Sequence, residues 1–245
     1  MLLCLGLAAY ATLRGVIGAL RAPVEQWTTL DLGRRGFEHQ GVVDIVAAAS
    51  GFGAAPVRVV ISLAVGGGFL FYCFGDRRFR RSTRDIAAGL VIGGLVALGW
   101  LITGVLGADE FEPTPLASFT FVGPLGDLLQ YLMTYTGSRI NFGVASVLGI
   151  IAGAFLAAWS SGALKLEGFT DARDMLRHMA GGVMMGAGGV LALGCTIGQG
   201  ITGMSTLALG SLIAWPSIVA GGWCGIKYLE EGSLRGALRA VLARG

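Results

Sequence analysis

Residues 181–203 read GGVMMGAGGVLALGCTIGQGITG and hold nine glycines in 23 positions, interrupted by one short polar segment. Gly182 and Gly186 form a small-xxx-small pair, the spacing that lets a neighbouring membrane helix approach closely. Glycine also permits a break in a helix at membrane depth, where non-helical backbone is tolerated only inside the protein or along a cavity. The stretch therefore predicts a membrane helix that breaks around Cys195.

The composition of the whole chain indicates the same environment. The 245 residues are 54% hydrophobic and only 13% charged, whereas a soluble domain carries roughly 25% charged residues. Because a soluble surface cannot hold that much apolar area, this composition excludes a plain globular domain and a disordered chain. It indicates an all-α integral membrane protein, whose partner is the lipid bilayer in which it is embedded. The net charge of +3 is too small to indicate a nucleic-acid partner.

Three long apolar stretches predict membrane spans, because a crossing helix needs about 20 apolar residues. They cover residues 57–74, 86–107 and 142–164. The segment between the first two, residues 76–85, holds five arginines. By the positive-inside rule we expect this arginine loop on the cytoplasmic side.

Two other segments are expected to enter the bilayer without crossing it on their own. Residues 1–13 are too short to span before Arg14, so they are interpreted as the end of a helix or a shallow insertion. Residues 116–136 are apolar but broken by glycine and proline, which predicts a re-entrant or interfacial segment. Its Asp127 is expected to face a cavity or the interface, since a charge in hydrocarbon is costly. Pro216 is expected to interrupt the last apolar stretch.

The candidate site is the polar turn inside the glycine-rich stretch. Broken helices whose N-termini point inward are a recurrent way to hold an anion within a membrane. We expect a helix that begins near Gly203 or Ser205 to supply free backbone N–H groups. We also expect Cys195 to contact a permeant sulfur-bearing anion through its soft, weakly donating thiol. The predicted substrate pathway comprises Cys195, Thr196, Gly198, Gln199, Gly200, Gly203 and Ser205.

Other chemistries find little support among the residues. The chain has four widely separated cysteines, no C-x-x-C pair and only two histidines, which argues against a zinc or iron–sulfur site. No His, Lys or Arg lies near Cys195 in sequence to activate its thiol, which argues against an enzyme that acts through a Cys195 persulfide. We therefore expect no metal, no cofactor and no catalytic residue.

The residues around Cys195 resemble the YeeE/YedE family, the sulfur-transport family that includes thiosulfate transporters. Residues 175–225 carry the resemblance most specifically, with support from GSRINFGVASVLGIIAGAF at 137–155 and, less specifically, LGLAAYATLRGVIGALR at 5–21. The resemblance implies a helical bundle of two pseudo-symmetric halves with re-entrant helices, multi-pass in the bacterial inner membrane. It also implies import of thiosulfate or a related anion, passed along cysteine thiols by transient hydrogen bonds. The cysteine of the GCTIGQG segment, one of that series, maps to Cys195.

The chain departs from the family pattern at its beginning, where the first half should carry its own Gly-Cys-Gly loop. Family members are usually longer at the N-terminus, so the resemblance implies an N-terminally incomplete chain. We expect one membrane domain, 1–245, in which residues 1–55 are the remnant of the first half and a connecting segment. Residues 56–245 then hold the remaining spans, with the re-entrant Cys-Gly loop at 179–215.

An alternative function stays open, that of a membrane subunit which docks a soluble sulfurtransferase or sulfur carrier. In this interpretation the arginines within residues 77–84 recruit an acidic cytoplasmic partner by electrostatic attraction. The two hypotheses differ in what they require. Transport depends on Cys195, whereas docking depends on the arginine loop.

Overall fold

The computed structural model describes residues 1–28, 41–51, 53–107, 115–165, 168–169 and 171–232. Within these ranges the regular structure is helical, apart from one isolated antiparallel bridge between Gly41 and Ala208. The α-helices are α1 (Leu2–Leu13), α2 (Val16–Thr28), α3 (Val42–Ser50), α4 (Ala54–Gly75), α5 (Arg77–Arg81), α6 (Thr83–Leu101), α7 (Val122–Met133), α8 (Phe142–Ser160), α9 (Ala172–Leu191) and α10 (Leu209–Glu231). Two π-helical segments, Ile102–Leu106 and Gly198–Gly203, and a 3₁₀ turn at Tyr135–Gly137 complete the helical structure.

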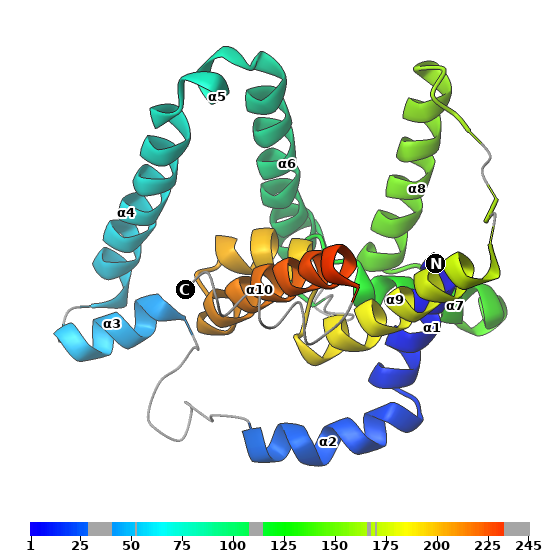
Figure 1. Ribbon diagram of the computed structural model, residues 1–245. Coiled ribbons are helices and arrows are strands. Elements are labelled where there is room, and N and C mark those ends of the chain that lie inside the picture. Colours follow the sequence, from blue (N-terminus) through cyan, green and yellow to red (C-terminus); the bar gives the residue numbers. More distant parts are fainter. Residues whose placement is uncertain (29–40, 52, 108–114, 166–167, 170, 233–245) are drawn as a thin grey trace.

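The long helices define the architecture. Figure 1 shows α4 and α6 joined through α5 into a hairpin, with α8 standing beside it and with α9 and α10 lying across the lower part of these helices. In the described part of the chain, four helices are long and apolar enough to cross a membrane: Ala55–Gly75, Thr83–Leu106, Phe142–Ser160 and Leu209–Glu231. The chain is therefore an all-α membrane protein, as expected. The pseudo-symmetry of two halves stays a prediction.

The arginine loop forms the tip of the α4–α6 hairpin, where two polar side chains cap the N-termini of α5 and α6. Asp76 accepts a hydrogen bond from the backbone N–H of Arg78 at 2.8 Å, and Ser82 accepts one from the N–H of Asp85 at 3.3 Å. Such caps satisfy N–H groups that have no partner inside the helix. The arginines are thereby held together at one end of the molecule (Figure 1).

α1 and α2 together have the length and composition of one broken span or of a re-entrant loop. Their axes differ by 55° across a short break after Leu13. α1 has 12 residues, a length of about 18 Å at 1.5 Å per residue, too short for a hydrocarbon core of about 30 Å. α1 packs tightly against α9, because a Cβ on Gly186 would overlap the carbonyl oxygen of Leu5, and one on Gly182 would lie 3.0 Å from that of Met1. The predicted small-xxx-small contact is confirmed, and its partner is α1.

α7 is the other short helix, and it fills the space between α1 and α8. Its 12 residues are again too few to cross a membrane, in keeping with the expected re-entrant or interfacial segment. Asp127 lines a cavity and pairs with Arg14, with 3.7 Å between the guanidinium nitrogen and the carboxylate oxygen. Arg14 also donates to the side-chain carbonyl of Gln130 at 2.8 Å. The core around α7 consists of Leu5, Ala9, Val122, Leu125, Leu128, Val144, Val147 and Val190.

The expectation that Pro216 interrupts the last apolar stretch is wrong. α10 runs without a break from Leu209 to Glu231, with Pro216 inside it. Proline removes one backbone N–H from the helix, and membrane helices tolerate this loss when neighbouring groups satisfy the freed carbonyl. The break in this part of the chain lies before Leu209 instead, and it separates α10 from the Cys195 turn.

Candidate functional site

The chain turns sharply between α9 and a short helix that starts directly after Cys195. α9 ends at Leu191, and Leu193 and Gly194 then take positive φ angles of 56° and 157°. A leucine at positive φ is uncommon, and such conformations store strain that the surrounding structure must support. Helical backbone resumes at Thr196, so Cys195 occupies the last position of the turn.

The helix after Cys195 is wound more widely than an α-helix. Residues 198–203 form a π-helical segment, a conformation that is rare and frequently occurs at functional sites. A second left-handed residue, Leu207 with a φ of 52°, follows before α10 begins at Leu209. Two strained leucines therefore bound the short helix that carries the candidate site.

This helix starts earlier than the sequence suggested. The expected start near Gly203 or Ser205 is wrong, because the first helical residue is Thr196. The positive φ of Gly194, together with that of the preceding leucine, completes the turn before Cys195. The first N–H groups of a helix lack partners within it, so these groups belong to the residues that directly follow the cysteine.

The three glycines of the π-helical segment serve close packing, and none of them has a positive φ. A Cβ on any of them would lie within 2.8 Å of a side-chain atom from another segment. Such a distance is far below van der Waals contact, so a larger residue would push the neighbouring segment away. The pairs are Gly198 with Thr120, Gly200 with Trp215, and Gly203 with Ser211.

Several side chains of the turn donate hydrogen bonds to other parts of the protein. The side-chain amide of Gln199 donates to the carbonyl of Ala192 at 2.7 Å, and the hydroxyl of Thr202 donates to the carbonyl of Phe119 at 2.6 Å. Ser205 donates to the carbonyl of Thr202 in the same helix at 2.6 Å, and it accepts a hydrogen bond from the indole N–H of Trp100 on α6 at 3.2 Å. These side chains fix the turn to its surroundings, whereas Cys195 and Thr196 face a cavity.

That cavity, the Cys195 chamber, has a volume of about 480 Å³. Cys195 is half-buried and packs against the core that holds α1, α7 and α8 together, and Thr196 is exposed. Among the described residues, those that line the chamber carry no charge, and its polar contacts come from the turn itself. The apolar walls are formed by Leu2, Leu5, Phe121, Val122, Leu125, Val147, Ile150, Ile151, Ala154, Met185 and Ile197.

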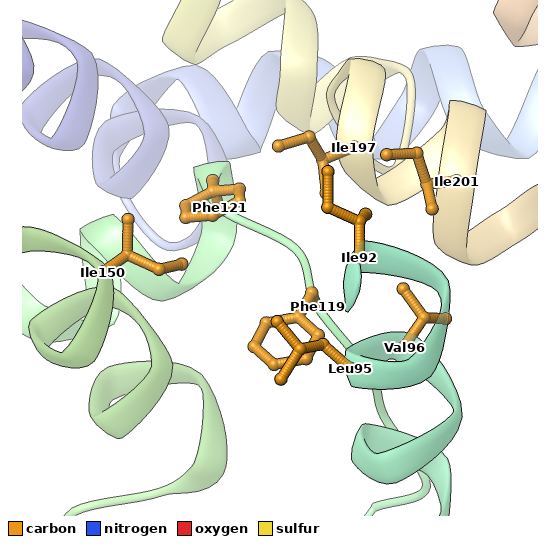
Figure 2. A pocket seen from close by; sticks show the side chains of 8 residues that line it. All are labelled: Ile92, Leu95, Val96, Phe119, Phe121, Ile150, Ile197 and Ile201. Carbon is orange, nitrogen blue, oxygen red and sulfur yellow. The ribbon is translucent and has the colours of Figure 1, made fainter. Parts of the chain in front are cut away.

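A second apolar cavity, of about 210 Å³, adjoins the chamber on the side of α6. The two share Phe121, Ile150 and Ile197 as lining residues. Figure 2 shows Ile92 of α6 reaching toward Ile197 and Ile201 of the helix that follows Cys195, and the ring of Phe119 beside Leu95 farther along α6. Apolar walls thus continue from Cys195 toward α6.

The irregular segment 115–121 lies between these apolar cavities and a third cavity, which has both polar and apolar lining residues. Phe119 and Phe121 line the second apolar cavity, whereas Ser118 and Thr120 line the third cavity, of about 440 Å³, which Asp127 also lines. These four residues were not among the predicted site residues. The signal was the strict alternation of polar and aromatic residues in the run SFTF, which in extended backbone sends successive side chains to opposite sides.

The other cysteines lie on separate helices. Cys4 on α1 and Cys73 on α4 are half-buried, Cys224 on α10 is exposed, and all of them are free thiols, as is Cys195. The described residues contain no group of His, Cys, Asp and Glu side chains that would hold a metal ion. The geometry brings Cys195 together with a helix N-terminus and an apolar chamber, and it leaves the other three thiols apart on their own helices.

Comparison with known proteins gives the family. The profile described as "Sulphur transport" matches residues 1–224. The thiosulfate transporter TsuA of Spirochaeta thermophila is 29% identical over 226 residues, which cover 89% of this chain and 63% of that protein. TsuA of Escherichia coli K12 is 29% identical over 154 residues, which cover 63% of this chain and 38% of that protein. The matches thus span less than two thirds of either relative. The chain belongs to the sulphur-transport family.

Proposed function

We propose that this protein is a permease of the bacterial inner membrane that imports thiosulfate or a related sulfur-containing anion. The observation that carries the proposal is the position of Cys195, at the broken helix and on the wall of a chamber lined by α1, α7, α8 and α9. The naming of two relatives as thiosulfate transporters supports the substrate class. The proposed pathway uses Cys195 and Thr196 as contacts and the glycines at 198, 200 and 203 to bring the surrounding segments close.

A thiol suits this task because it binds weakly. Its S–H group is a weak donor and its sulfur is polarizable, so it can hold a sulfur-bearing anion for a short time. The helix that starts at Thr196 adds backbone N–H groups and the positive end of its dipole. A permanent counter-charge would trap a divalent anion in a medium of low dielectric. We therefore propose passage by transient hydrogen bonds, with no covalent step and no catalytic residue.

The apolar walls have a role in the same proposal. Burying an anion away from water is costly unless it is hydrogen-bonded, so walls such as Val122 and Ile150 offer it no resting place. The anion is stable only where the thiol and the helix N-terminus meet it. The chamber thereby restricts binding to one short stretch of the pathway.

Uptake by the reconstituted protein tests the proposal. Proteoliposomes that contain the full chain should accumulate labelled thiosulfate above the level of empty liposomes, and a reductant should leave the rate unchanged because no disulfide forms. Absence of uptake by correctly inserted protein would contradict the proposal. Turnover of thiosulfate in detergent, without any compartment, would instead indicate an enzyme.

The arginine loop favours a second candidate, a membrane subunit that docks a soluble sulfurtransferase or sulfur carrier. Four exposed arginines lie on the five-residue helix α5, at the tip of the α4–α6 hairpin. A cluster of one sign attracts an acidic partner over a distance and raises its association rate. Replacing the arginines by glutamine should abolish function under the docking hypothesis and spare uptake in proteoliposomes under the transport hypothesis. The four are Arg77, Arg78, Arg80 and Arg81.

A further inference from the structure

Gln199 is a buried amide whose two ends are both bonded within the protein. Its nitrogen donates to the carbonyl of Ala192 at 2.7 Å, and its oxygen accepts from the hydroxyl of Ser211 at 2.5 Å. Gln199 is 9% exposed and Ser211 is 3% exposed. A buried polar side chain is retained at little cost only when its partners are in place, so these two bonds act as one unit.

The bonds of Gln199 join three successive pieces of the chain. Ala192 is the C-cap of α9, Gln199 lies in the π-helical segment, and Ser211 lies in the first turn of α10. The backbone N–H of Gln199 also donates to the carbonyl of Cys195 at 2.7 Å. The cysteine is thus held between the end of one helix and the residue that ties together all three pieces.

Two glycines, Gly194 and Gly203, leave space for the side chains of Gln199 and Ser211. A Cβ on Gly203 would overlap Ser211 and lie 3.1 Å from the amide oxygen of Gln199. A Cβ on Gly194 would lie 3.2 Å from the Cγ of Gln199, at a φ of 157° that only glycine adopts readily. Two of the glycines that flank Cys195 are therefore explained by the space that the Gln199–Ser211 pair occupies.

We propose that Gln199 and Ser211 are positioning residues that set the location of the Cys195 thiol. Gln199 acts through the cysteine and not as a ligand of the transported anion, because the side chain is buried and bonded to the protein at both ends, while Cys195 and Thr196 line the chamber. The strained backbone at Leu193 stays in place because this unit ties both ends of the turn. The inference deepens the proposed function, since the thiol that is positioned is the proposed contact of the anion.

The reactivity of Cys195 toward a small membrane-permeable maleimide tests this inference. The full chain is used with the other cysteines replaced by serine, so that Cys195 is the single reactive thiol. Gln199→Met keeps the volume of the side chain and removes both bonds, and Ser211→Ala removes one. Loss of a hydrogen bond that stabilises the closed turn by about 1 kcal/mol should raise alkylation about fivefold, and loss of both should raise it more.

Ser217→Ala is the matched control, because the hydrogen bond that the structure gives the Ser217 side chain stays within α10, to the carbonyl of Ile213. It should leave the alkylation rate unchanged. Equal rates for Gln199→Met, Ser211→Ala and Ser217→Ala would overturn the inference. If Gln199→Met does not fold, the comparison of Ser211→Ala with Ser217→Ala decides in the same way.

Uptake measurements separate this inference from the proposed function. If both hold, Ser211→Ala should raise the KM for thiosulfate severalfold, since the thiol is displaced, while Ser217→Ala leaves the KM unchanged. If the parent protein shows no uptake, the proposed function fails. The alkylation rates then still decide whether the pair positions Cys195, because they do not depend on transport.

Discussion

Gly203 has no Cβ, and this absence lets α10 approach the Cys195 turn closely. The residue lies in the π-helical segment, and the space of its absent Cβ is taken by the hydroxyl of Ser211. Gly210, near the start of α10, has nothing within 4 Å of the same position. Both glycines lie near the end of a helical segment but differ in what surrounds their Cβ positions, so a comparison of the two isolates the effect of packing.

Gly203→Ala should therefore destabilise the protein, whereas Gly210→Ala should not. Neither glycine lies in the interior of an α-helix, so helix propensity contributes little to either change. Overpacking at Gly203 should cost about 1–3 kcal/mol. Thermal unfolding in detergent measures the difference as a lower Tm for Gly203→Ala. Equal Tm values for the two variants would show that Ser211 does not occupy the space beside Gly203.

The Cys195 site shows which residues could be predicted from sequence and which could not. The glycine spacing and the polar turn singled out Cys195, because both signals are local. The pairing of Gln199 with Ser211 was not foreseeable, since it depends on where α10 starts and on the break at Leu207. Gln199 was expected on the substrate pathway because amides donate hydrogen bonds, and sequence does not say which acceptor they reach.

At the scale of the element, α9 packs against α1 through a face that carries two glycines, Gly182 and Gly186. The carbonyl of Leu5 lies where a Cβ of Gly186 would stand, and Gly182 faces Met1 one turn earlier. Small residues at such an interface let backbones approach, which maximises van der Waals contact where no hydrophobic driving force acts between helices. Gly188 lies on the same helix and has open space around its Cβ position.

Gly186→Ala should loosen the α1–α9 contact, and Gly188→Ala is its control. The added methyl group at Gly186 meets backbone, which cannot rotate away, so a cost of about 1–3 kcal/mol is expected. Chemical or thermal unfolding in detergent should show the loss for Gly186→Ala alone. A Tm for Gly186→Ala that matches or exceeds that of Gly188→Ala would contradict the close packing of α1 on α9.

The spans were predictable because about 20 consecutive apolar residues are a strong signal. The expected spans at 57–74, 86–107 and 142–164 coincide closely with α4, α6 with its π-helical end, and α8. The break predicted at Pro216 was wrong. Proline does weaken a helix locally, but α10 continues through it within a long apolar stretch. Breaks made by left-handed leucines leave no comparable mark in a sequence.

At the scale of the whole molecule, the arginine loop and the start of α8 lie at opposite ends. Figure 1 shows α5 at one end of the hairpin and the N-terminal end of α8 near the crossing helices. If the arginine loop is cytoplasmic, as the positive-inside rule predicts, the start of α8 faces the outside. Import of an anion needs such a defined orientation.

Labelling of introduced cysteines tests this orientation. In a background without native cysteines, Thr83→Cys should react with a membrane-impermeant maleimide only in inside-out vesicles. Gly137→Cys, which lies before α8 and has open space around it, should react only in right-side-out vesicles. Labelling of both positions from the same side would contradict the arrangement.

The measurement that tests the account most directly is the initial rate of labelled thiosulfate uptake by the full chain with Cys195→Ala. The matched control is Cys224→Ala, which removes an exposed thiol from α10. We predict uptake at the level of empty liposomes for Cys195→Ala and near the parent rate for Cys224→Ala, with equal Tm for both. Parent-level uptake by folded Cys195→Ala would contradict the central claim that this thiol contacts the transported anion.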